Sequence, residues 1–79
     1  SLNPVKIIIE ISKQKAHLLQ NLPLHRSQKK VLENSNHVRF ELFVKPNQEL
    51  LNRIIRYIDI IKIIEPFELK VSIKKILKE

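Results

Sequence analysis

The chain has 79 residues, the length of one small domain. It contains no cysteine and no glycine, which excludes disulfides, thiolate chemistry and glycine-rich phosphate loops. A net charge of +7 suits a nucleic-acid partner and simple solubility equally well. No apolar run approaches the roughly 18–20 residues that span a bilayer. The start of the chain has no signal-peptide character, and no membrane contact is expected. Small secreted domains usually need disulfides, so the absence of cysteine favours the cytoplasm, or a fragment stabilised by neighbouring domains.

The first half of the chain predicts a strand, a short helix and a second strand. Residues 5–11 carry β-branched side chains at every second position, which is typical of a strand. Ser12 is a suitable N-cap for an amphipathic helix over residues 13–21, and Pro23 stops that helix. After a basic loop, residues 28–33 predict a strand from a weak signal.

The next segment predicts a hairpin and a helix. Residues 34–36 have turn chemistry, with asparagine suited to the left-handed conformation, and residues 38–44 form a strong alternating strand. Asn47 caps the following helix, whose apolar stripe runs over residues 50–58 at helical spacing. Phe40 falls on the core face of its strand.

The last segment predicts a buried strand and a final helix. Residues 60–64 form a strand with much of both faces buried, and Pro66 suits the first turn of the helix that follows. The order is then β-α-β-β-α-β with an additional C-terminal helix. This order predicts an α+β fold of the ferredoxin-like kind, in one domain over residues 1–79, with helices on one face of an antiparallel sheet.

Catalysis and metal binding have little support in the sequence. His17, His25 and His37 fall on three different elements without a helical partner or a cysteine nearby. A Ser27 nucleophile with His25 as its base lacks an aspartate to orient the imidazole, since Asp59 is the only aspartate. We therefore expect no enzyme activity and no cofactor.

The outer sheet face allows two other functions. RNA-binding sheets stack bases on exposed aromatic side chains, and here only Phe43 is expected to point outward. Alternatively, Ile8, Phe43 and the isoleucines of the last strand leave an apolar sheet face that pairs with a second copy or another domain. A stand-alone basic nucleic-acid-binding module of the same fold stays open as the rival function.

The basic loop over residues 22–30 is the strongest functional candidate. It fits neither a helical nor a strand period, and no carboxylate occurs between Glu10 and Glu33. Its exposed donors suit phosphates, carboxylates or the backbone of a partner. The candidate ligand or partner-domain contacts are His25, Arg26, Ser27, Gln28 and Lys29. The alternative is a solvated connection in which only the apolar residues pack down.

Three segments resemble one family. Residues 22–29 resemble the "LPLHxSQ" stretch, residues 49–57 the "ELxxxIxxY" segment, and residues 61–70 the "VxVLEPxxLR" ending of the C-terminal extension in WYL-domain transcriptional regulators. The resemblance covers nearly the whole chain. Two departures are Ile58, where the family commonly has glycine, and Lys70, which replaces a frequent arginine and loses its bidentate geometry.

The resemblance implies a regulatory module within a bacterial transcription factor. In this family a helix-turn-helix domain binds DNA and a WYL barrel binds an effector. The extension has a ferredoxin-like fold linked to dimerisation and effector response. It implies as partners the WYL and helix-turn-helix domains of the parent chain, a second copy, and an anionic or nucleic-acid effector. DNA would be contacted only through the parent protein.

Overall fold

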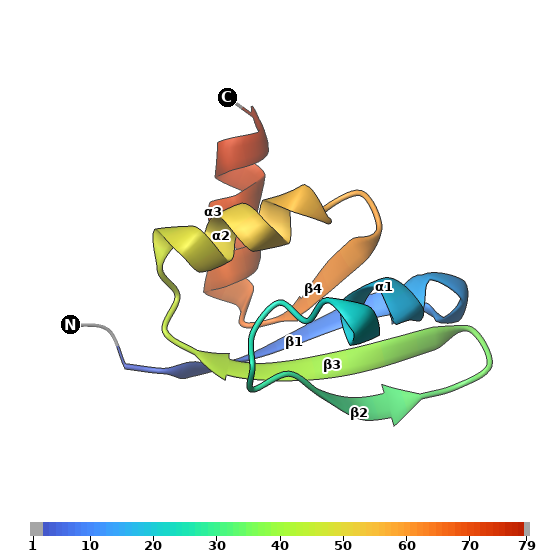
Figure 1. Cartoon of the computed structure of the whole chain (residues 1–79). Coiled ribbons are helices and arrows are strands. Elements are labelled where there is room, and N and C mark those ends of the chain that lie inside the picture. The colour runs from blue at the N-terminus through green and yellow to red at the C-terminus, as the bar shows by residue number, and fades with distance from the viewer. Residues whose placement is uncertain (1–2, 79) are drawn as a thin grey trace.

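A computed structural model describes residues 3–78 as a four-stranded sheet with helices stacked on one side (Figure 1). In chain order the elements are β1 (Val5–Ser12), the 3₁₀ turn η1 (Lys13–Lys15), α1 (Ala16–Asn21), β2 (Lys29–Glu33), β3 (His37–Val44), α2 (Gln48–Arg56), β4 (Ile61–Glu65) and α3 (Phe67–Lys78). The predicted α+β class is confirmed.

The sheet has the order β2-β3-β1-β4, and every neighbouring pair is antiparallel. The register brings Ile9 of β1 opposite Phe40 of β3 on one side and opposite Ile63 of β4 on the other. Because cross-strand partners point to the same face, this alignment places the alternating apolar residues of three strands under the helices.

The core lies between this sheet face and the helices. Its buried side chains come from all three α-helices, from three of the strands and from the basic loop: Ile7, Ile9, Ile11, Ala16, Leu19, Leu24, Val38, Phe40, Leu42, Val44, Leu50, Ile54, Ile61, Ile63, Leu69 and Ile73. The predicted core position of Phe40 is confirmed. The prediction that β4 is buried on both faces is wrong, because Lys62 faces solvent.

The predicted first helix starts differently from the expectation. Residues Lys13–Lys15 form a 3₁₀ turn before α1, and the Ser12 side chain makes no capping hydrogen bond. The Lys13 N–H instead donates to the Asn36 carbonyl at 2.9 Å, across the sheet end. That bond satisfies the Lys13 N–H, one of the first donors of the turn, which have no partner within a helix.

The hairpin turn also uses a different device from the predicted one. No residue between 3 and 78 has a positive φ angle, so no asparagine is left-handed here. The Asn34 side-chain oxygen accepts from the N–H groups of Asn36 and His37, both at 2.8 Å. The asparagine side chain therefore takes the part of a backbone acceptor in the turn.

The start of α2 agrees with the prediction, and its end does not. The Asn47 side chain accepts from the Leu50 N–H at 2.9 Å, as an N-cap does. The helix ends at Arg56, two residues before the predicted end. The Tyr57 N–H contacts the carbonyls of the preceding turn, and Ile58 packs against the core from a turn. No residue between 3 and 78 has a positive φ, so Ile58 does not take the left-handed conformation that a glycine cap would use.

Helix α3 stands steeply on the sheet (Figure 1). The Pro66 carbonyl accepts the Lys70 N–H at 3.3 Å, so the proline directly precedes the helix. Leu69 and Ile73 are buried, whereas Phe67 is 72% exposed. The steep orientation thus leaves part of the apolar surface of α3 in solvent.

The outer sheet face is charged, and the prediction of an apolar face is wrong. Ile8 is only 8% exposed, because Glu41 and Glu65 stand opposite it on the two neighbouring strands. Phe43 does point outward, as predicted, and is 58% exposed. Three ion pairs cross the strands: Lys6–Glu65 at 3.9 Å, Lys29–Glu41 at 3.5 Å and Arg39–Glu10 at 2.9 Å.

A candidate contact site at the basic loop

The basic loop is anchored in the core by one leucine. Leu24 is 1% exposed and packs within the main hydrophobic cluster. Its carbonyl accepts a hydrogen bond from the Arg53 Nη1 of α2 at 3.0 Å. The sequence after Pro23 therefore turns inward, and the loop is fastened both to the core and to α2.

Gln28 closes the loop. Its Oε1 accepts from the Leu24 N–H at 2.9 Å, and its Nε2 donates to the Leu19 carbonyl of α1 at 2.8 Å. Its own N–H donates to the His25 carbonyl at 3.0 Å. One side chain thus satisfies two backbone groups of largely buried residues and links the end of α1 to the start of β2.

His25 and Ser27 form the second fastening. The Ser27 N–H donates to His25 Nδ1 at 3.1 Å, so that nitrogen acts as an acceptor in the loop. The Ser27 hydroxyl lies 2.8 Å from the same nitrogen and accepts from the Phe43 N–H at 2.9 Å. Within residues 3–78 no carboxylate is hydrogen-bonded to His25. The pair therefore holds the loop against β3.

The two remaining candidates face solvent. Lys29 Nζ lies 3.5 Å from Glu41 Oε1, while Arg26 makes no hydrogen bond or ion pair with the residues that the structure describes. The expectation of exposed donors is confirmed for these two residues. It is wrong for His25, Ser27 and Gln28, which are partly buried and bonded within the molecule. Whether the five contact a ligand or partner stays a prediction.

A groove beside the loop adds residues that the sequence did not single out. The hollow, of about 250 Å³, lies between the loop and the end of α2 and is lined by Leu22, Pro23, Leu24, Arg53, Arg56 and Tyr57. We call it the arginine groove. The sequence does show that Arg53 and Arg56, three residues apart on one helix, lie on the same face of it. It does not show that residues 22–24 approach that face.

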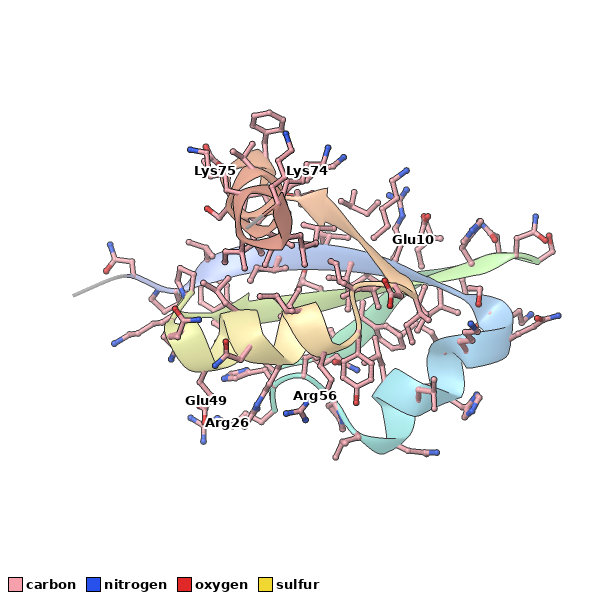
Figure 2. All side chains as sticks on the ribbon, turned by 90° about the horizontal axis from the view of Figure 1, so that it is seen from above. Glu10, Arg26, Glu49, Arg56, Lys74 and Lys75 are labelled. Carbon is pink, nitrogen blue, oxygen red and sulfur yellow. The ribbon has the colours of Figure 1, made fainter. Side chains whose placement is uncertain are left out.

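The groove side of the molecule is rich in arginine. Figure 2 shows Arg26 and Arg56 on the same side as Glu49, with Lys74 and Lys75 of α3 on the opposite side. Glu49 Oε2 lies 3.7 Å from Arg53 Nη2, and both side chains are largely in solvent. Arg56 has no acidic partner among residues 3–78. Positive charge is therefore left uncompensated here.

Two acidic residues away from the groove, Glu10 and Glu33, are engaged by basic side chains. The hydrogen bond from Arg39 lowers the pKa of Glu10, and hydrogen bonds from Lys30 and Lys13 lower the pKa of Glu33. Both carboxylates are therefore ionised at neutral pH and offset lysine or arginine charge on the sheet. Among residues 3–78, Arg26 and Arg56 have no acidic partner at the loop and the end of α2, and Lys74 and Lys75 have none on α3. The arginines differ from these lysines in their planar, bidentate donor geometry.

Residues 3–78 contain no cluster of three or more acidic, histidine or cysteine residues able to hold a metal. Of the helices in this range, none is long and apolar enough to cross a membrane. Comparison with protein-family models and with curated proteins finds no match for the chain. The function is therefore argued from the contacts and charges of the site.

Proposed function

We propose that this chain is the C-terminal regulatory and oligomerisation module of a cytoplasmic bacterial transcriptional regulator of the WYL-domain type. It would contact the WYL effector domain or its ligand and would carry out no chemistry of its own. The observation that carries the proposal is the construction of the basic loop. His25, Ser27 and Gln28 build a rigid platform, and Arg26 stands free in solvent on it.

The fold supports the proposal through its topology. In the ferredoxin-like assignment each half of the chain is a strand, a helix and a second strand, with a strand of the other half between them. The order β2-β3-β1-β4 agrees, since β3 lies between β1 and β2, and β1 lies between β3 and β4. The additional α3 follows β4, as expected for the proposed module.

The loop geometry supports a contact role over a solvated connection. A loop that is already fastened to α1, to β3 and to α2 loses little conformational entropy when a partner binds. An exposed guanidinium on such a loop can meet a carboxylate or phosphate with fixed geometry. These side-chain bonds also satisfy backbone groups of the loop, and they leave the exposed Arg26 available to a partner.

The rival function, a stand-alone nucleic-acid-binding module, has weaker support. Several cations of the outer sheet face are paired with carboxylates, and Phe43 is the exposed aromatic side chain of that face. A phosphate backbone would have to displace those carboxylates, and the sheet offers a single ring for stacking. We therefore keep the regulatory module as the proposal.

The test uses the regulator that contains this chain. Arg26→Ala with Lys29→Ala is expected to alter the effector response in a reporter assay, or the oligomeric state by sedimentation. The matched control is Lys74→Ala with Lys75→Ala, which removes the same charge from α3. Unchanged response and assembly would remove the loop from the mechanism. If the coding sequence upstream of this chain encodes no helix-turn-helix and no WYL barrel, the chain is not part of a WYL-type regulator.

A further inference from the structure

We infer that the arginine groove docks a protein segment that carries an apolar side chain flanked by carboxylates. The inference rests on the proposed function and deepens it, because it names the chemistry of the partner at the loop. The groove combines an exposed apolar rim, an aromatic wall and guanidinium groups. Figure 2 shows one of its arginines, Arg56, on the same side of the molecule as Arg26.

The apolar part of the groove is open to solvent. Leu22 is 63% exposed and Pro23 is exposed, whereas Leu24 beneath them is buried in the core. The half-buried ring of Tyr57 lines the same hollow. An apolar side chain placed in a hollow of this kind buries both its own surface and that of Leu22.

The charged part is positioned before a partner arrives. Arg53 is held by the Leu24 carbonyl at 3.0 Å, which directs its guanidinium along the groove wall. Its contact with Glu49 is 3.7 Å long and solvated, so a carboxylate of the partner can compete with it. Arg56 and Arg26 lie on the same side and supply further donors for bidentate carboxylate binding.

The composition and charge of the groove favour a protein segment over a nucleic acid or a second copy. Tyr57 is the single aromatic residue in the groove wall, so a nucleic acid would find one ring for base stacking there, whereas the exposed Leu22 and Pro23 suit an apolar side chain. A second copy carries a net charge of +7, which opposes its approach to a basic groove. An acidic segment with one apolar anchor meets both parts of the groove.

The experiment is an NMR titration of the isotope-labelled 79-residue chain with a short synthetic peptide that places a Leu-Phe pair between Asp and Glu residues. We expect shifts at the groove residues Leu22, Arg53 and Tyr57. Arg56→Gln should weaken binding roughly tenfold, as the loss of one charge-assisted contact does. The matched control is Lys75→Gln, which removes one charge from the last turn of α3, on the opposite side in Figure 2, and should leave binding unchanged.

A second pair of variants tests the apolar anchor. Leu22→Ser should weaken binding, and Phe67→Ser should not, although both remove an exposed apolar side chain. Both residues are solvent-exposed, so circular dichroism should show all variants folded.

Several results would overturn the inference. The first is that the peptide does not bind at low ionic strength, and the second is that a peptide with Asn and Gln in place of Asp and Glu binds equally well. The third is that Lys75→Gln lowers the peptide affinity as much as Arg56→Gln does. The fourth is that a single-stranded oligonucleotide binds the groove more tightly than the peptide. If the peptide does not bind but the coding sequence encodes a helix-turn-helix and a WYL barrel upstream of this chain, only this inference is overturned. If the peptide binds but those upstream domains are absent, only the proposed function is overturned.

Discussion

The substitution Gln28→Leu tests whether the loop is a built platform. It removes an acceptor from the Leu24 N–H and a donor from the Leu19 carbonyl, and both residues are at most 1% exposed. Each backbone group left without a partner costs roughly 1–3 kcal/mol, and partial access of water lowers the sum to about 2–4 kcal/mol. A chain of this length is stable by only about 4–12 kcal/mol, so the loss is a large share of the total.

Urea denaturation followed by circular dichroism measures the change, with an unchanged m-value marking a stability effect. The control is Gln20→Leu, the same chemical change at an exposed position of α1, where the free energy of unfolding should change by less than about 0.5 kcal/mol. If Gln28→Leu also stays within that range, the loop is held by other contacts. The argument from a rigid platform then fails.

Three other expectations follow from single contacts. Asn47→Ala removes the cap of α2 and should lower the free energy of unfolding by about 1 kcal/mol, and Asn47→Asp should restore most of it. Ile54→Val removes one methylene at a fully buried site and should cost about 1 kcal/mol in thermal or urea unfolding, while an unchanged stability would contradict the packing. The hydrogen bond from Arg39 lowers the pKa of Glu10, so this bond stabilises the fold above the unfolded-state pKa and is lost as the pH falls. Glu10→Gln should therefore cost up to about 1 kcal/mol at neutral pH and progressively less as the pH falls through the lowered pKa of Glu10, and a pH-independent difference would refute the linkage.

The regular elements could be predicted because their signals are local. Period-two alternation identified β3 and placed Phe40 inside and Phe43 outside, which the structure confirms. The Asn47 cap follows from one side chain and the backbone of the same turn. Patterns of this kind depend on neighbours within a few residues, and the chain itself carries that information.

The remaining features depend on contacts between distant segments. The charged outer face arises from register, since Ile8 meets Glu41 and Glu65 only when three strands align. The basic loop was located, but its last two predicted residues, Lys29 and Lys30, belong to β2. Gln28 also reaches a carbonyl nine residues earlier, and no local pattern encodes that reach. The arginine groove needs the loop and α2 side by side. Arg53, Arg56 and Tyr57 were therefore assigned only to a helix, and Leu22, Pro23 and Leu24 only to the loop.

The loop's bonding also sharpens what the family resemblance can mean. In the pattern "LPLHxSQ" the named polar letters fall on His25, Ser27 and Gln28, which are the residues bonded inside the loop. Arg26, the exposed residue, falls on the unspecified position x. A pattern whose specified residues form hydrogen bonds within the loop identifies the conformation of the loop. It does not identify the ligand that the loop binds. The residues that select a ligand or partner are then expected to be Arg26 and the arginines of α2. The titrations with Arg56→Gln and with its control Lys75→Gln test whether an arginine of α2 contributes to binding.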